Sequence, residues 1–110
     1  MNLLLEFKLK RHVKRLGLPV DFKIDFRVYS KTYHARYNPN KKLVIMYLIN
    51  NKGKRYDYSY ILEHTLHEVI HHYQWVHDPY FTRIKGVMHN PEFKELERLY
   101  KQKAKSLNLL

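Results

Sequence analysis

The chain contains no cysteine among its 110 residues, which excludes disulfide bonds, thiol catalysis and cysteine-ligated zinc ribbons. It also has no apolar stretch long enough to cross a bilayer. The apolar start at residues 3–5 is broken by Glu6 and Lys8, which is not the pattern of a signal peptide. No Gly/Ser linker or internal repeat divides the sequence. We therefore expect one monomeric domain over residues 1–110, cytoplasmic and without a membrane partner.

Acidic residues are also scarce: 10 Asp and Glu stand against 21 Lys and Arg, a net charge of +11. Hydrophobic residues at 45% place the chain among folded proteins, so this is not a disordered basic tail. The basic residues cluster over 8–14, 41–42, 52–55 and 101–105. Such patches suit a nucleic-acid backbone, and we expect contact with DNA. The alternative is a solvated surface that keeps a small protein soluble.

Hydrophobic periodicity predicts an α+β fold with a three-stranded, mainly antiparallel sheet. The predicted elements are a helix over 2–16, strands over 20–28, 32–37 and 43–49, a helix over 59–76, and a last helix that begins at Asn90-Pro91. Asp57 or Ser59 is expected to cap the second helix. The expected inner face of the last helix consists of Phe93, Leu96, Leu99, Tyr100 and Leu107.

Within the second predicted helix, His67-Glu68-Val69-Ile70-His71 matches the pattern HExxH. Residues four apart on a helix project in nearly the same direction, so His67 and His71 can bind one metal ion. Glu68 is rotated by about 100° from His67, where it can hold a water molecule as general base without binding the ion. The pattern therefore predicts a metal centre. The alternative is a pair of surface histidines on a helix rich in histidine.

A catalytic zinc ion needs a third protein ligand and an open position for water. His77 lies where the metzincin pattern places that ligand, but Gln74 replaces the glycine that turns the chain, and a continuous helix puts His77 about 120° away from His71. Glu92 and His89, near the start of the last helix, are the other candidates. We rank His89 above Glu92 and His77, because the 17 residues after His71 allow the chain to return.

The segment from Leu66 to Trp75, followed by His89-Asn90-Pro91-Glu92-Phe93-Lys94, resembles the SprT-like metallopeptidase domain, the family of the Spartan-type DNA–protein crosslink proteases. The resemblance covers residues 32–100. It implies a zincin-like fold and one zinc ion held by His67, His71 and His89, with Glu68 as the general base. Two departures stand out: Asn90 replaces the usual glycine after the third histidine, and no cysteine is present for the zinc ribbon of many bacterial members.

These observations predict a zinc-dependent endopeptidase that hydrolyses a protein substrate and associates with DNA. The alternative is a nucleic-acid-binding module whose zinc site is structural or catalytically silent. A carboxylate between two ligands favours the enzyme, because a structural site has no use for Glu68. Candidates for stabilising the oxyanion are Tyr73, Tyr80 and His72. We interpret His64, one turn before His67, as a solvated side chain rather than part of a cleft.

Overall fold

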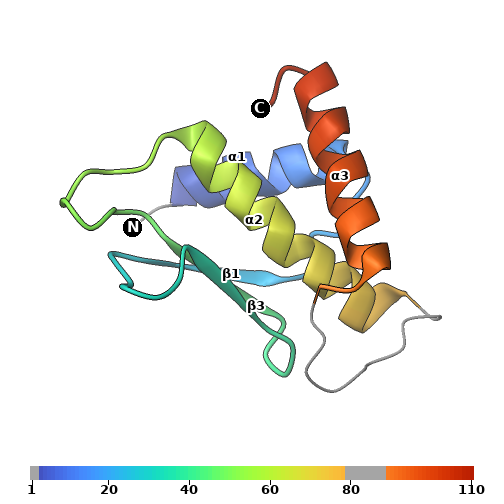
Figure 1. Cartoon of the computed structure of the whole chain (residues 1–110), viewed down its shortest axis with the longest axis horizontal. Coiled ribbons are helices and arrows are strands. Elements are labelled where there is room, and N and C mark those ends of the chain that lie inside the picture. The colour runs from blue at the N-terminus through green and yellow to red at the C-terminus, as the bar shows by residue number, and fades with distance from the viewer. Residues whose placement is uncertain (1–2, 79–88) are drawn as a thin grey trace.

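The computed structural model describes residues 3–78 and 89–110, and confirms the α+β class (Figure 1). Its elements are α1 (Leu3–Arg15), β1 (Lys23–Arg27), β2 (Ala35–Asn38), β3 (Leu43–Tyr47), α2 (Tyr58–His72), the π-helical segment η1 (Tyr73–His77) and α3 (Pro91–Ser106). Every predicted element is present, with shorter strands than predicted. Figure 1 shows the three helices gathered above the sheet. Within the described ranges, no helix combines the length and the apolarity that a membrane span requires.

The sheet is mixed, with the strand order β1-β3-β2. Strand β3 pairs parallel with β1, where Val44 lies opposite Ile24, and antiparallel with β2, where it lies opposite Tyr37. The prediction of a mainly antiparallel sheet is therefore wrong for β1. The chain forms β2 at the far edge of the sheet and then reverses direction to form β3 between β1 and β2. Strand β2 is therefore antiparallel to β3, and β1 runs in the same direction as β3. Alternation of apolar residues predicts that a strand forms, but not which neighbour it pairs with.

Helix α2 supplies the centre of the core. Its apolar residues Leu62, Leu66, Val69 and Ile70 are completely buried, as their helical spacing predicts. They pack in one cluster with residues of β3 and α1, among them Val44, Met46, Leu9 and Val13. The helix begins at Asp57, whose side chain accepts a hydrogen bond from the backbone N–H of Tyr60 at 2.9 Å. The two residues between Glu68 and His71, Val69 and Ile70, thus anchor the HExxH segment in the core.

Helix α3 begins as predicted, because the side chain of Asn90 accepts a hydrogen bond from the backbone N–H of Phe93 at 2.8 Å and Pro91 occupies the first turn. Its buried residues are Phe93 and Ala104. Leu99, predicted to face inward, is 47% exposed. The other predicted residues do face the core, because Leu96, Tyr100 and Leu107 are partly buried and pack against it, so Leu99 is the exception.

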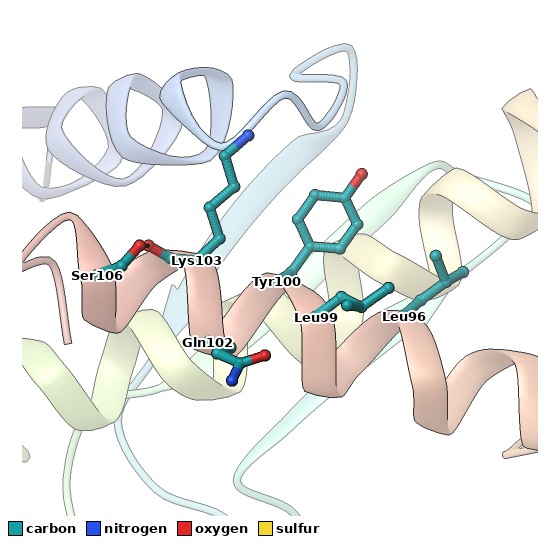
Figure 2. A pocket seen from close by; sticks show the side chains of 6 residues that line it. All are labelled: Leu96, Leu99, Tyr100, Gln102, Lys103 and Ser106. Atoms are coloured by element: carbon teal, nitrogen blue, oxygen red, sulfur yellow. Dashed lines mark hydrogen bonds between the residues drawn. The ribbon is translucent and has the colours of Figure 1, made fainter.

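The C-terminal half of α3 contacts Leu16, the residue that follows α1, through a hydrogen bond. Lys103 Nζ donates a hydrogen bond to the carbonyl oxygen of Leu16 at 3.1 Å, and Figure 2 shows this side chain reaching from α3 toward α1. Beside it lies a hollow of about 480 Å³ lined by Leu96, Leu99, Tyr100, Gln102, Lys103 and Ser106 (Figure 2). None of these described lining residues carries an imidazole or a carboxylate, so the candidate chemistry lies elsewhere.

Candidate metal centre

Three imidazole rings converge where α2 meets the start of α3. Nε2 of His89 lies 3.0 Å from Nε2 of His67 and 3.2 Å from Nε2 of His71. Zinc binds imidazole nitrogen at about 2.0–2.1 Å, so three ligands of a tetrahedral ion stand about 3.3 Å apart. The side chains therefore fit one such ion. The structure brings His67, His71 and His89 together, the three ligands that the sequence ranks first.

Phe93 forms the floor of this cluster. Its ring centroid lies 4.8 Å from that of His67, 4.2 Å from that of His71 and 4.9 Å from that of His89. The ring is 1% exposed, so it cannot move without opening the core. Because Asn90 and Pro91 set the first turn of α3, they also set where Phe93 and His89 lie relative to α2. One aromatic ring thus aligns the histidines of two separate segments.

The carboxylate of Glu97 orients His67 from behind. Its Oε2 contacts Nδ1 of His67, and Lys101 Nζ lies 3.5 Å from the same oxygen. Burial opposes ionisation of Glu97, but the hydrogen bond with His67 holds its pKa below the ordinary value. An ionised carboxylate only accepts hydrogen bonds, so Nδ1 of His67 is the donor to Glu97, and in the neutral ring the lone pair is on Nε2, which faces the cluster. This is the tautomer that a metal ion requires.

Sequence reasoning missed Glu97. The available signal is its position: Glu97 follows Phe93 by four residues and precedes Tyr100 by three, on the inner face of α3. A carboxylate on an inward face needs a partner, because burying an unpaired charge is costly. The partner is 30 residues away in sequence, so periodicity alone does not identify it.

Glu68 lies beside the histidines and is 8% exposed. Its Oε2 is 3.9 Å from Nε2 of His67. Burial, reinforced by the negative charge of Glu97, raises the pKa of Glu68 to about 7. Burial lowers the pKa of His71 to about 3, and also lowers that of His89. In the metal-free protein, burial thus favours the neutral imidazoles of His71 and His89, beside a carboxyl group that can gain or lose a proton near neutral pH.

An open cleft of about 330 Å³ gives access to the cluster. It is lined by Tyr33, Ala35, Arg36, Tyr37, His67, Glu68, His71 and His89. Three of these, residues 35–37, are consecutive on β2. Side chains alternate between the two faces of a strand, so three consecutive lining residues mean that the cleft runs along the edge of β2. Within residues 3–78 and 89–110 no other strand pairs with that edge, because β2 is the last strand of the sheet and pairs on its other side with β3.

The other candidates from the sequence lie outside this cluster. Glu92 is exposed and lines a separate hollow with Tyr73 and Asp78. His64 is half-buried against Tyr60 and His34, at ring-centroid distances of 4.2 and 5.0 Å, so its interpretation as a solvated side chain is wrong. Tyr80 lies outside the described residues.

His77 and His72 belong to a second group, with Asp21. Nε2 of His77 is 2.9 Å and Nε2 of His72 is 2.8 Å from Oδ1 of Asp21. Burial alone would raise the pKa of Asp21, but the hydrogen bonds from both histidines lower it to about 2. The sequence pattern makes His77 a competitor for the first cluster and gives no local signal that links it with Asp21. Among the residues that the structure describes, two groups of side chains could each hold a metal ion.

No match was found among protein-family models, curated proteins or solved structures. The resemblance to the SprT-like domain and the zincin-like assignment therefore stay predictions, carried by the quoted residues. What the structure adds is independent of them: two groups of side chains with the ligand chemistry of a transition-metal ion, one of which opens into a cleft with a buried carboxyl group.

Proposed function

We propose that this chain is a zinc-dependent endopeptidase that acts on protein substrates and associates with DNA. The observation that carries the proposal is the position of Glu68, buried beside three convergent imidazole nitrogens and lining the same open cleft. A structural zinc site is usually closed by four protein ligands. This group offers three among the described residues, together with a carboxyl group suited to proton transfer and space for a substrate.

His67, His71 and His89 would hold the ion. When bound, zinc supplies Lewis acidity, polarising a water molecule and the carbonyl oxygen of a peptide. Glu68 takes a proton from the attacking water at a carboxylate oxygen while the water oxygen bonds to the carbonyl carbon. It then gives this proton to the amine nitrogen as the C–N bond breaks, so the carboxylate is regenerated. The products are a new carboxyl terminus and a new amino terminus.

The edge of β2 supports a peptide as substrate. An exposed strand edge presents unpaired N–H and C=O groups, which pair readily with another extended chain. Since residues 35–37 line the cleft, a peptide added to this edge would pass beside His71 and Glu68. Main-chain pairing recognises extended polypeptide with little demand on its side chains, so the proposed substrate is an unfolded or locally unfolded protein.

Charge supports the association with DNA. The net charge is +11, and most of the basic side chains in the clusters identified from the sequence are exposed: Lys8, Arg11, Lys14, Lys41, Lys42, Lys52, Lys54, Arg55, Lys103 and Lys105. Binding through phosphate contacts loses affinity steeply as salt rises. We therefore expect the affinities for DNA molecules of unrelated sequence to fall by the same factor between about 50 and 200 mM salt. The number of phosphates contacted sets that factor.

The test combines zinc content with self-cleavage, in the presence and absence of DNA. Wild-type protein loaded with zinc is expected to cleave itself. Glu68→Gln is expected to keep its zinc and lose about 10²- to 10⁴-fold in rate, the usual contribution of a general base. Glu92→Gln is the matched control, because Glu92 is exposed and outside the cleft. Zinc-loaded wild type that is inert with and without DNA would instead favour the nucleic-acid-binding module with a silent metal site.

A further inference from the structure

A second group of metal-binding side chains lies next to the first in sequence but does not share its cleft. It consists of Asp21, which precedes β1, His72, which ends α2, and His77, which ends η1. Asp21 Oδ1 lies 2.8 Å from Nε2 of His72, and both carboxylate oxygens lie 2.9 Å from Nε2 of His77. One ligand atom from each residue lies within 4.8 Å of the others.

The π-helical segment is what brings the two histidines together. On a regular α-helix, residues five apart project about 140° from each other. In η1 the backbone N–H of Asp78 instead bonds to the carbonyl oxygen of Tyr73, five residues earlier, at 3.0 Å. This wider turn stacks residues five apart, so the rings of His72 and His77 lie 5.5 Å from centroid to centroid. Insertions of π-helix are uncommon and occur frequently at functional sites.

His72 is held in the orientation that a ligand needs. It is completely buried, and each of its ring nitrogens has a partner: Nε2 faces Asp21, and Nδ1 lies 2.7 Å from the hydroxyl oxygen of Tyr37. Metal-binding histidines commonly have their second nitrogen fixed by such a hydrogen bond. Asp21 and His77 are accessible by comparison, at 50% and 37% side-chain exposure, which leaves an approach for an ion.

We propose that Asp21, His72 and His77 form a second metal site, which binds a divalent zinc-like transition-metal ion independently of the His67–His71–His89 cluster. Two imidazoles and one carboxylate are a ligand set used for such ions, and they leave positions for water or a further ligand. The proposal does not depend on the peptidase assignment, because it concerns different side chains and a different readout.

One consequence connects the second site with the cleft. An ion on Nε2 of His72 leaves Nδ1 as the nitrogen that carries the ring proton. Nδ1–H then donates to the hydroxyl oxygen of Tyr37, and the Tyr37 proton is free for another acceptor. Tyr37 lines the cleft together with Glu68 and His71. If the peptidase assignment holds, the second ion would thus prepare Tyr37 to donate a hydrogen bond to a peptide carbonyl oxygen in the cleft.

The test uses the full chain, stripped of metal by a chelator and titrated with Zn²⁺. Ring-nitrogen NMR signals report each histidine separately. We expect two equivalents to bind, with Nε2 of His72 and His77 shifting to the values of metal-bound imidazole. His77→Gln and Asp21→Asn, both at accessible positions, are expected to weaken the second ion at least about 10-fold while His67, His71 and His89 still respond. His89→Gln is expected to give the reverse pattern.

Two results would overturn the second site. One is a wild type that binds a single equivalent, lost in His89→Gln and kept in His77→Gln. The other is an unchanged spectrum of His72 and His77 at saturating Zn²⁺. The peptidase proposal fails differently: two bound ions with no cleavage would contradict the enzyme and leave the second site standing.

Discussion

The Glu97 carboxylate accepts a hydrogen bond from Nδ1 of His67, across the interface between α3 and α2. In the neutral ring this contact leaves the lone pair of Nε2 facing His71 and His89, and it places the group that orients His67 on α3, which begins 20 residues after His71. The helix that delivers Phe93 as a floor therefore also delivers the group that selects the tautomer of His67.

Substitution of Glu97 tests whether this contact supports metal binding. Glu97→Gln is expected to weaken zinc binding by about 10- to 100-fold, the usual effect of losing a partner behind a metal-binding histidine. Glu95→Gln is the control, because Glu95 lies on the same helix but pairs with Arg98 at the surface. Competition with a chromophoric chelator measures the affinity. Equal affinities in the two variants would show that Glu97 does not act through His67.

Phe93 and Leu99 test which face of α3 is buried. Phe93→Ala is expected to lower the free energy of unfolding by about 3–5 kcal/mol, the range for removing a buried aromatic side chain. Leu99→Ala, at a position 47% exposed, is expected to cost clearly less. Denaturant unfolding of the metal-free proteins measures both. A larger loss in Leu99→Ala would restore the inner face predicted from the sequence and contradict the packing described for Phe93.

Asn90 caps the start of α3 through its side chain. Asn90→Ala is expected to cost about 1 kcal/mol of stability, because the cap on the backbone N–H of Phe93 is lost. Asn90→Gly is expected to cost only a few tenths of a kcal/mol, since glycine is tolerated at a helix start. Thermal unfolding compares the two. An Asn90→Ala protein as stable as the wild type would show that this cap contributes nothing.

The buried carboxyl group of Glu68 is expected to make the stability of the metal-free protein depend on pH. Its pKa is raised to about 7 in the folded, metal-free protein, from an ordinary value of 4.5. The folded protein holds the carboxyl proton more tightly than the unfolded chain does. The carboxyl group therefore contributes stability that is fully present below pH 4.5 and is lost as pH rises through 7. The stability of wild type minus that of Glu68→Gln is therefore expected to fall by about 3 kcal/mol between pH 4 and pH 8 in chelator.

Because His71 also titrates, the pH dependence of Glu68 has to be measured as the difference in stability between wild type and Glu68→Gln. The folded pKa of His71 is lowered to about 3 from 6.5, so its contribution is present above pH 6.5 and is lost as pH falls, opposite in direction to that of Glu68. The wild-type curve alone mixes the two. Subtracting Glu68→Gln isolates the carboxyl group, and a difference that stays constant from pH 4 to pH 8 would contradict the burial described for Glu68.

The sequence was most informative where structure depends on local spacing. The apolar stripe of α2, the HExxH pattern and the Asn90-Pro91 start of α3 all follow from residues within a turn or two of one another. Long-range pairing is different. Neither the parallel register of Ile24 with Val44 nor the contact of Glu97 with His67 leaves a local periodicity to detect.

The π-helical turn of η1 illustrates the same limit. Projecting His77 along a regular α-helix separates it from the face of α2 that carries His67 and His71, which correctly removes it from the first cluster. The wider turn places it beside His72, and the approach of Asp21, 51 residues before His72, completes the group. A helical projection assumes one hydrogen-bond pattern, so it does not anticipate a site that depends on a change of pattern.

The central claim is that Glu68 promotes hydrolysis of peptide bonds by water in the cleft beside His67, His71 and His89. Its most direct test is to incubate the zinc-loaded chain with an unfolded protein in H₂¹⁸O and analyse the fragments by mass spectrometry. The account predicts one ¹⁸O atom in each new carboxyl terminus with wild type, and about 10²- to 10⁴-fold fewer fragments with Glu68→Gln. Fragments formed equally fast by Glu68→Gln, or no fragments from zinc-loaded wild type, would contradict it.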